Sequence, residues 1–532
     1  MKLRHDALYA SRRSPVLARN MVSTSQPLAA QAGLRMLWAG GNAADAALAS
    51  AIALTVVEPT GNGLGSDAYA IIWDGKELHG LNASGRAPAA WNPERFAGSD
   101  TMPQRGWESV TTPGAVSSWR EISEKFGKLP FEKLFEPAIE YATRGFAVSP
   151  IIATLWEKGG DLLGKQPGFA EAFLPGGKAP KAGELFVNKA AAESLIDIAE
   201  TKGESFYRGK LASKIAAFAK DHGAALSEED LGNHKADWVG TISQSFGNVK
   251  LHEIPPNGQG ISALIALGIL RHTNITDYEP DSVEALHLEI EAMKLAFADM
   301  QAYVADLDYM TDVTVEHLLS DDYLKSRAAL IDANKAQDFK AGAPKHGGTV
   351  YVSTADENGM MVSFIQSNYM GFGSGVVVPG TSISLQNRGH GFSLKDGHPN
   401  LVKGGKRPFQ TIIPAFLMGL DGNPVMSFGV MGGPMQAQGH LQMTLRTQLW
   451  GQDPQTAADA PRWQALSGLN VAVETSVGAD VIDALKAKGH VIKVETPDST
   501  NFGFGGAQLI AKTDAGYVAG SDPRKDGCAV GY

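Results

Sequence analysis

Two hydroxyl side chains stand beside runs of glycine, where a nucleophile could reach a bound substrate. Thr349 follows Gly347-Gly348 and begins a segment that alternates apolar and polar residues, and Ser374 lies within the run GFGSG at residues 371–375. A hydroxyl becomes an effective nucleophile when a nearby base accepts its proton. The local pattern alone assigns Thr349 simply to the start of a strand, because threonine favours strands. The chemistry therefore depends on what the rest of the chain brings to these two residues.

Familiar signatures of metal, nucleotide and cysteine chemistry are absent from the sequence. It contains no HExxH, GxxxxGK[ST] or CxxC. Residues 61–66, GNGLGS, approach a dinucleotide-binding fingerprint, but they end in serine and precede a strand pattern instead of a helix. Residues 371–375 lack the GxSxG elbow, so a conventional serine hydrolase using Ser374 is a secondary alternative. Cys528 is the only cysteine, which excludes an internal disulfide and a cysteine-based zinc site.

The composition narrows the class of protein. The 532 residues carry a formal net charge of -10, which argues against nucleic acid or an anionic membrane as a partner, because either needs a basic surface. The first 20 residues include basic side chains but no continuous apolar core of a secretory signal. The most apolar stretch, residues 46–57, is too short to cross a membrane. We therefore expect a cytoplasmic protein without a transmembrane segment.

Helical periodicity is clearest in the first part of the chain. Residues 27–38 repeat apolar side chains every four positions and stop at Gly40-Gly41. Asn42 is then predicted to cap a second helix, whose small residues on every side suit burial between two layers. Residues 281–284 have capping-box spacing ahead of a long amphipathic helix. Residues 341–346 have a loop-like composition and form the predicted linker.

Strand patterns dominate beyond this linker. Residues 349–355 and 360–367 alternate on either side of a turn and predict a hairpin. The remaining predicted elements are strands at 68–73, 412–418, 425–430, 471–474 and 508–512, and helices at 436–449 and 480–488. Strands between layers of helix indicate a helix–sheet–sheet–helix sandwich or another α/β arrangement.

A series of short motifs, taken in their order along the chain, indicates a protein family. From residue 347 onward they are Gly347-Gly348-Thr349, the hairpin, Gly373-Ser374-Gly375, Gln386-Asn387-Arg388, Arg407-Pro408 and Gly432-Gly433-Pro434. Upstream and at the C-terminus they are GGNAADAA at 40–47, VEP at 57–59, TPGAV at 112–116, FGKLP at 126–130 and SDPR at 521–524. This order resembles the γ-glutamyltransferase family and covers nearly the whole chain.

The resemblance implies an N-terminal nucleophile hydrolase with a four-layer αββα fold. The chain would cleave itself between Gly348 and Thr349, and the large subunit, 1–348, and small subunit, 349–532, would stay associated as a heterodimer. Cleavage frees the α-amino group of Thr349, which titrates near pH 8 and can act as the base for its own hydroxyl. Because one residue then supplies both nucleophile and base, no metal or organic cofactor is expected.

The resemblance also implies supporting roles around this threonine. Ser367 occupies the place of a family hydroxyl that hydrogen-bonds the nucleophile, although a polar residue at a strand end is an equally good interpretation. Gly432 and Gly433 would donate backbone N–H groups to the tetrahedral oxyanion. Without the family context, the same Gly-Gly-Pro sequence would simply be a turn.

Departures from the family pattern bear on the substrate. Gly391 stands where the family places an aspartate that binds the α-ammonium of γ-glutamyl substrates, and Arg388 lies nearby. Arg388 could bind a substrate carboxylate, and a surface ion pair is the competing interpretation. The other candidate substrate-binding residues are Asn387, His390, Arg86 of the shortened Gly85-Arg86-Ala87-Pro88 motif, and Thr411 in place of the family's serine pair.

These departures favour hydrolysis of a small carboxylate-bearing amide, with an oxamate-type amide first. Within the family they are more similar to oxamate amidohydrolase and glutaryl-acylase-like members than to true transpeptidases. A glutathione hydrolase or γ-glutamyltransferase and a glutaryl acylase are the alternatives. An unprocessed binding protein with the same fold is the non-enzymatic alternative.

Overall fold

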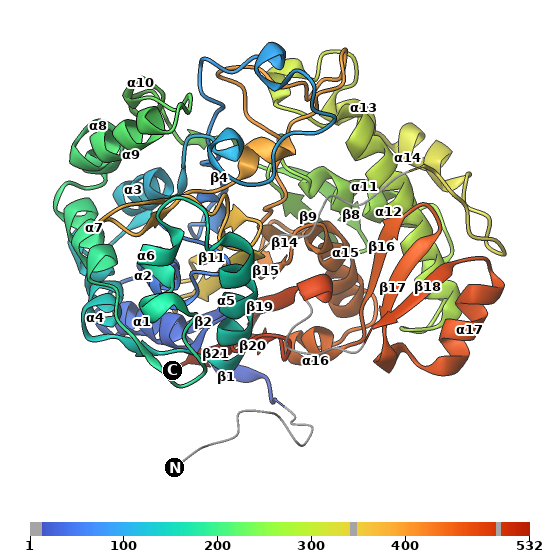
Figure 1. The fold of residues 1–532 in the computed structure, drawn as a ribbon. Helices are drawn as coiled ribbons and strands as arrows, with labels where there is room; N and C mark the ends of the chain where they lie inside the picture. Colours follow the sequence, from blue (N-terminus) through green and yellow to red (C-terminus); the bar gives the residue numbers. More distant parts are fainter. Residues whose placement is uncertain (1–12, 341–347, 496–501) are drawn as a thin grey trace.

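The computed structural model describes residues 13–340, 348–495 and 502–532 (Figure 1). The predicted linker at 341–346 lies outside these residues. Two antiparallel sheets of seven strands form the centre of the molecule. In order across the first sheet, the strands are β1 (Val16–Ala18), β20 (Gly516–Ser521), β19 (Gly506–Thr513), β15 (Pro424–Met431), β14 (Ala415–Gly419), β9 (Val249–Glu253) and β8 (Ile242–Phe246). In the second sheet they are β21 (Cys528–Gly531), β2 (Met21–Thr24), β10 (Gly348–Ala355), β11 (Met361–Tyr369), β3 (Asp67–Trp73), β4 (Leu78–Asn82) and β7 (Asp237–Trp238).

The two sheets pack face to face through large side chains and a few hydroxyls. Tyr351 of β10 and Phe416 of β14 belong to one buried cluster between the sheets. Ser353 Oγ lies 2.6 Å from Ser427 Oγ, which links β10 directly to β15. Period-2 alternation sends these side chains inward, and the opposite faces remain to be covered by helices.

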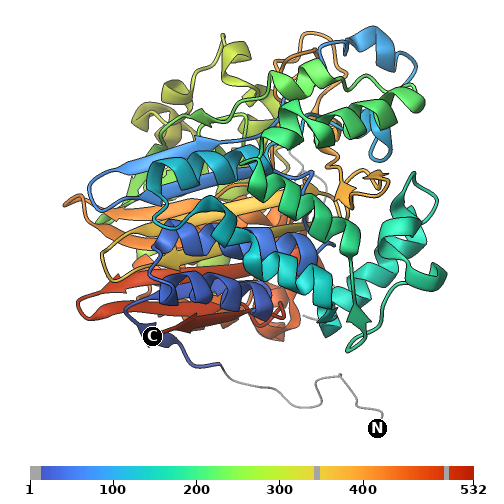
Figure 2. The ribbon, with the colours of Figure 1, turned by 90° about the vertical axis from the view of Figure 1, so that its left-hand side faces the viewer.

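Helices cover both outer faces and complete four layers. On the second sheet lie α1 (Pro27–Trp38) and α2 (Ala43–Val57), which Figure 2 shows in front of the strands. On the first sheet lie α11 (Gly260–Leu270), α12 (Val283–Tyr303) and α15 (Met435–Gln448). The order helix–sheet–sheet–helix is therefore present. It is one of the arrangements that the alternation of elements left open, and it is the one that the family resemblance implied.

Further helices surround the layer that contains α2. They are α3 (Ala115–Phe126), α4 (Glu136–Arg144), α5 (Pro150–Leu163), α7 (Lys189–Glu200) and α9 (Lys210–Asp221). A small sheet of β16 (Trp463–Ser467), β17 (Asn470–Glu474) and β18 (Val491–Glu495) packs with α17 (Ala479–Ala487) near the other outer layer. In the part of the chain that the structure describes, no helix combines the length and apolarity that crossing a membrane requires.

Most predicted element boundaries agree with the structure, and two differ. Helix α1 matches its prediction, and Asn42 caps α2 in a capping box with Asp45. The strand predicted from residue 412 begins at Ala415. The capping-box spacing at 281–284 misplaced the cap of α12, because Ser282 is the N-cap residue whose side chain accepts from the N–H of Ala285.

The two portions that meet at residue 348 are not separate globular domains. Each sheet contains strands from both sides of this position. Five pairings join them: β10 with β2, β11 with β3, β14 with β9, β21 with β2 and β20 with β1. Backbone hydrogen bonds and the core between the sheets thus connect the two portions along their length.

Candidate active site

Thr349 lies at the start of β10, within an irregularity of the strand ladder. The register with β11 shifts between Gly348 and Val350, and Thr349 is only 2% exposed. Its Oγ1 donates to Ser367 Oγ at 3.1 Å, and Ser367 Oγ donates to the carbonyl oxygen of Gly348 at 2.7 Å. The N–H of Tyr369 donates to the same Ser367 oxygen at 2.8 Å. One serine therefore connects the threonine hydroxyl to the carbonyl of the peptide bond before it.

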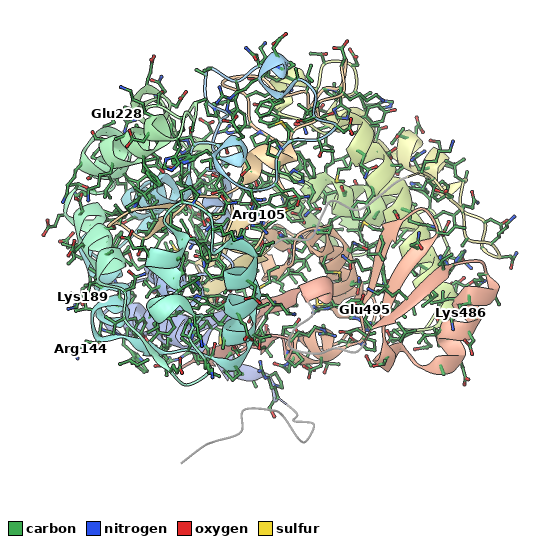
Figure 3. All side chains as sticks on the ribbon, in the orientation of Figure 1. Arg105, Arg144, Lys189, Glu228, Lys486 and Glu495 are labelled. Carbon is green, nitrogen blue, oxygen red and sulfur yellow. The ribbon has the colours of Figure 1, made fainter. Side chains whose placement is uncertain are left out.

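Backbone from two other segments closes around this peptide bond. A methyl group at Gly348 would lie 3.1 Å from the carbonyl oxygen of Thr60 and 3.4 Å from the Cα of Gly371. A methyl group at Gly61 would lie 3.3 Å from the nitrogen of Thr349. Arg105, labelled near the centre of Figure 3, holds the segment after β11 by donating to the Gly371 carbonyl at 2.9 Å. Glycine at 61 and 348 allows this close approach.

Gly432 and Gly433 form a sharp turn between β15 and α15. Their φ angles of 126° and 60° are in the region that favours glycine. Within the described residues, neither N–H donates a hydrogen bond to a protein acceptor. Both groups are therefore available to an oxyanion, which is consistent with their predicted role.

Contacts between the sheets direct this turn toward the end of β10 where Thr349 lies. Ser353 is bonded to Ser427, and the ring of Tyr351 packs directly on Gly429, so β10 and β15 run past each other in step. If this alignment continued for two more residues, Thr349 would stand opposite Met431, the residue that precedes Gly432. The start of β10 and the end of β15 therefore point toward the same edge of the sandwich.

Gln259 connects the Gly432-Gly433 turn to a second part of the site. Its Nε2 donates to the carbonyl oxygens of Gly433, at 2.8 Å, and of Thr411. The hydroxyl of Thr411 in turn accepts from Arg388 Nη1 at 2.9 Å. This chain of contacts brings Gly433, Thr411 and Arg388 together, although they are far apart in sequence.

Arg388 is buried, which excludes the surface ion pair considered from the sequence. Its side chain is 1% exposed, and its guanidinium lies 4.8 Å from the ring centre of Tyr369 in a cation–π contact. Burial lowers its pKa to about 10, so it remains charged at neutral pH. Among the described residues, Nε and Nη2 have no hydrogen-bond partner. These two atoms form one edge of the planar guanidinium, the geometry that binds both oxygens of a carboxylate.

Asp67 supplies a negative charge near this arginine. It is fully buried and pairs across the β3–β11 ladder with Ser367. It accepts from the N–H groups of Gly85 and Gly114 and from Gln410 Nε2. Burial raises its pKa to about 6, and the charge of Arg388 and these hydrogen bonds oppose the rise. Asp67 therefore titrates close to neutral pH at the edge of the site.

The other predicted substrate-binding residues differ in how the structure uses them. Asn387 is buried, and both ends of its amide are bonded to backbone, at Met370 N–H and the Gln104 carbonyl. His390 stacks on Tyr369 and has Nδ1 2.7 Å from the Met102 carbonyl oxygen. Arg86 is 43% exposed and faces Asp306 and Asp237. Asn387 thus supports the loop, and no contact brings Arg86 to Arg388 or Thr349.

Gly391 and Ser374 are each constrained by the backbone around them. A methyl group at Gly391 would overlap the carbonyl oxygen of Phe409, so this position has no room for a larger side chain. Ser374 is fully buried, and its hydroxyl donates to the Leu385 carbonyl at 2.7 Å. No histidine or carboxylate of the described chain contacts that hydroxyl. A serine hydrolase using Ser374 is therefore wrong.

Three site residues escaped sequence reasoning. Asp67 directly follows the glycine-rich run at 61–66, so its position after that run was the available signal. Tyr369 has a φ of 79°, which is unusual for a residue with a side chain. No sequence pattern indicates this conformation. Gln259 precedes α11 in an ordinary turn. Their roles follow from contacts between segments that lie far apart along the chain.

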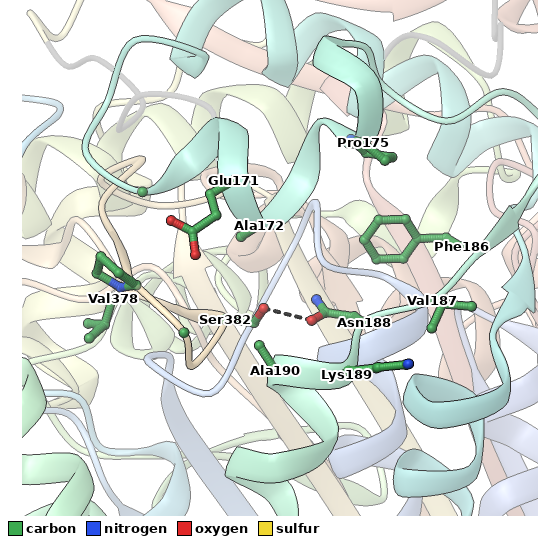
Figure 4. A pocket seen from close by; sticks show the side chains of 13 residues that line it. Glu171, Ala172, Pro175, Phe186, Val187, Asn188, Lys189, Ala190, Val378 and Ser382 are labelled. Atoms are coloured by element: carbon green, nitrogen blue, oxygen red, sulfur yellow. Dashed lines mark hydrogen bonds between the residues drawn. The ribbon is translucent and has the colours of Figure 1, made fainter.

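Cavities are found both at the site and away from it. A cavity of about 320 Å³ is lined by Tyr369, His390, Gly391 and Phe409, whereas Arg388 and Thr349 are not among its lining residues. Another of about 340 Å³ lies between α7 and the segment around Ser382, where Ser382 Oγ donates to Asn188 (Figure 4). This second cavity contains none of the predicted site residues.

A buried group of possible metal ligands lies apart from these residues. His287, Glu291 and His490 are close enough together to hold an ion. The ammonium group of Lys294 lies 2.5 Å from Glu291 Oε1, so a cation already neutralises the carboxylate. This cluster also holds the chain near Gln337, whose N–H donates to Glu291.

The fold and the site together define the class of protein, and similarity to known proteins defines the family. Two face-packed antiparallel sheets between helical layers, with a hydroxyl residue at the start of a central strand, are features of an N-terminal nucleophile hydrolase. The family model described as Gamma-glutamyltranspeptidase matches residues 29–532, and the chain belongs to this family. The chain is therefore an amide-hydrolysing enzyme, and the alternative of a non-catalytic binding protein is excluded.

Individual relatives span almost the whole chain. The chain is 36% identical to the glutathione hydrolase-like YwrD proenzyme of Bacillus subtilis, over 98% of this chain and 99% of that protein. It is 35% identical to the oxamate amidohydrolase proenzyme of Klebsiella pneumoniae, with the same coverage. The crystal structure of a cephalosporin acylase from Bacillus halodurans matches with a TM-score of 0.95 and 46% identity, over 100% of this chain and 99% of that one.

Proposed function

We propose that this chain cleaves itself between Gly348 and Thr349 and then uses Thr349 to hydrolyse the amide bond of a small carboxylate-bearing substrate. An oxamate-type amide is the favoured substrate. The hydrogen-bond chain from Thr349 through Ser367 to the Gly348 carbonyl supports the nucleophile. The observation that carries the substrate class is buried Arg388, with two N–H groups that no described residue satisfies.

Self-cleavage begins when Thr349 Oγ1 attacks the carbonyl carbon of Gly348. Ser367 already donates to that carbonyl oxygen, so it stabilises the negative charge that develops there. The Gly348–Thr349 C–N bond then breaks, the nitrogen takes up the proton that the Thr349 hydroxyl loses, and an ester joins Gly348 to the threonine oxygen. Water hydrolyses the ester, leaving a carboxylate at Gly348 and a free amino group on Thr349.

Turnover repeats this chemistry on a substrate. The freed amino group accepts the hydroxyl proton, and Oγ1 attacks the substrate's amide carbonyl. The N–H groups of Gly432 and Gly433 donate to the oxyanion, after which the amine leaves with the proton from the Thr349 amino group. Water attacks the resulting acyl-enzyme ester and releases the acid. Each step uses groups of the chain itself and water.

Arg388 sets the preference for an acidic substrate. A carboxylate that accepts from Nε and Nη2 would satisfy both unpaired donors, and Thr411 fixes the guanidinium through Nη1. The same positive charge repels the α-ammonium of a γ-glutamyl group. Gly391 stands where the family has its ammonium-binding aspartate, and the Phe409 carbonyl leaves no space for one. These features favour acidic amides over glutathione.

A glutaryl-type acylase is the second candidate. The 46% identity to a cephalosporin acylase supports it, and so does Arg388, because a glutaryl group also ends in a carboxylate. The two candidates differ in the distance between that carboxylate and the scissile carbonyl.

The two products of cleavage are proposed to remain a heterodimer. The relatives named as proenzymes support cleavage, and the five strand pairings across residue 348 support association. Separating the fragments would break both sheets and expose the core between them.

Two measurements test this function. Intact mass of the purified protein should give two chains that sum to the precursor plus one water. Turnover should be measured on the monoamides of oxalic, malonic, succinic and glutaric acids, with glutathione and the uncharged diamides as matched controls. We expect an acidic monoamide to have the highest kcat/KM and its length to separate the two candidates. A single intact chain, or faster hydrolysis of glutathione than of every monoamide, would contradict the proposal.

A further inference from the structure

A buried acid–histidine pair contacts strand β15 two residues before the turn at Gly432-Gly433. Glu253 belongs to β9 and His440 to α15, and both side chains are fully buried. Glu253 Oε1 and His440 Nδ1 are 2.6 Å apart. Neither residue contacts Thr349 or Arg388, so the steps of hydrolysis leave this pair without a role.

The pair is connected to the turn through one backbone N–H. His440 Nε2 accepts from Val430 N–H at 3.3 Å. Strand β14 begins at Ala415, opposite Phe428, so it does not extend along β15 as far as Val430. The histidine therefore satisfies an N–H next to the place where the neighbouring strand has ended.

This geometry determines where the proton of His440 lies. Because Nε2 accepts, the proton of the neutral ring is on Nδ1, which donates to Glu253 Oε1. Burial lowers the pKa of His440 to about 3 and raises that of Glu253 well above its ordinary value. The His440 ring is therefore neutral, and its hydrogen bond to Glu253 joins β9 to α15 as a brace.

The brace spans the turn from one side to the other. Val430 lies two residues before Gly432, whereas His440 lies in α15, which begins at Met435. Gly439 lets the helix approach closely, since a methyl group there would lie 2.6 Å from the Val430 side chain. The strand before the two glycines and the helix after them are thereby joined through His440.

We propose that Glu253 and His440 are positioning residues that hold the Gly432 and Gly433 N–H groups in place for the substrate oxyanion. The inference rests on the proposed function of these glycines. The inference predicts that turnover depends on the brace and self-cleavage does not, because the Gly348 carbonyl oxygen already accepts a hydrogen bond from Ser367 in the uncleaved chain. Loss of the brace should therefore impair hydrolysis and spare processing.

The test compares an apolar and a polar replacement of the acid. Glu253→Met should be processed normally by intact mass, with kcat lower by about 10- to 100-fold and KM changed less than about 2-fold, as for a misplaced oxyanion donor. Glu253→Gln keeps a neutral acceptor for His440 Nδ1–H and should retain nearly wild-type kcat. Should Glu253→Met fail to fold, His440→Phe breaks the same brace and must show the same split.

Glu289→Met is the matched control. Glu289 is another buried acid with a single side-chain bond, from Trp463 Nε1 at 2.8 Å, on helix α12. The inference is overturned if Glu253→Met lowers kcat no more than Glu289→Met, if it blocks processing equally, or if Glu253→Gln is as impaired as Glu253→Met. If the wild-type protein neither cleaves nor hydrolyses acidic monoamides, the proposed function itself fails, which is a distinguishable result.

Discussion

The two ends of the candidate site are built in different ways. At the nucleophile end, formed by Gly348, Thr349 and Ser367 on two central strands, the Thr349 and Ser367 hydroxyls are both hydrogen-bonded within the chain. At the carboxylate end, formed by Tyr369, Arg388 and Thr411 on connecting segments, a buried cation keeps two donors unpaired. The hydroxyls of the nucleophile end are paired within the chain, whereas the carboxylate end retains donors that the proposed substrate carboxylate would pair.

This difference would explain how one site can serve the two proposed reactions. The proposed self-cleavage needs only groups that the chain already holds together, so it would proceed on rigid strands without substrate. The proposed substrate hydrolysis would also need an external anion to satisfy Arg388, because leaving a buried charged donor unpaired is costly. Variants at the two ends should consequently have different effects on the two reactions.

The largest effect is expected at Thr349. Thr349→Ala removes the hydroxyl required for both reactions, so cleavage and hydrolysis should both be abolished. Intact mass and ammonia release measure the two losses. Thr349→Ser keeps a hydroxyl and should still cleave. A Thr349→Ala protein that still cleaves at this bond would show that Thr349 is not the nucleophile of self-cleavage.

Ser367→Ala should slow self-cleavage by about 100-fold, because it removes the donor to the Gly348 carbonyl oxygen. The fraction of intact chain followed over time after synthesis measures the rate. Ser367→Thr retains the hydroxyl and should process at nearly the wild-type rate. Equal rates for the alanine and threonine variants would show that this hydrogen bond does not assist cleavage.

Arg388→Ala should leave self-cleavage intact and lower kcat/KM for an acidic monoamide by about 10- to 150-fold, the loss expected for a charged hydrogen bond worth about 1.5–3 kcal/mol. The uncharged diamide serves as the control substrate and should be affected less. Arg388→Lys keeps the charge but loses the fork, so it should recover activity only in part. An equal loss of kcat/KM on both substrates would show that Arg388 does not recognise the substrate carboxylate.

A smaller effect is expected from pH at the carboxylate end. Burial raises the pKa of Asp67 from 3.8 to about 6, so this residue is mostly neutral at pH 5 and mostly ionised at pH 7. Its charge opposes a ligand carboxylate, and the inhibition constant of the product acid should therefore rise about 3-fold between these pH values. Asp67→Asn should remove the change. A dependence in the opposite direction would show that Asp67 does not act on the bound anion.

No effect is expected from chelation at either end. Incubation with EDTA should leave both cleavage and kcat unchanged, since nucleophile, base and oxyanion donors all come from the chain. The measurement is hydrolysis of the preferred monoamide before and after dialysis against the chelator. Loss of activity that a single divalent metal restores would show that the site needs a metal ion.

The sequence by itself determined the local part of this description. Apolar spacing gave the bounds of α1, Asn42 was recognisable as the cap of α2, and the turn at 356–359 defined the hairpin that begins at Thr349. Each depends on residues within one or two turns or strands, where backbone propensity and periodicity act directly. The order of the short motifs along the chain also identified the resemblance to the family.

Only the tertiary structure decided how Arg388 is used. A sequence cannot distinguish an arginine in a surface ion pair from a buried one, because its environment comes from Asp67, Tyr369 and Thr411, which reach it from three separate segments. For the same reason the sequence kept Arg86, which pairs with Asp306 near the surface, as a second candidate for binding the carboxylate. Burial and unpaired donors are properties of the packed chain, so they emerge when the two sheets and their connections come together.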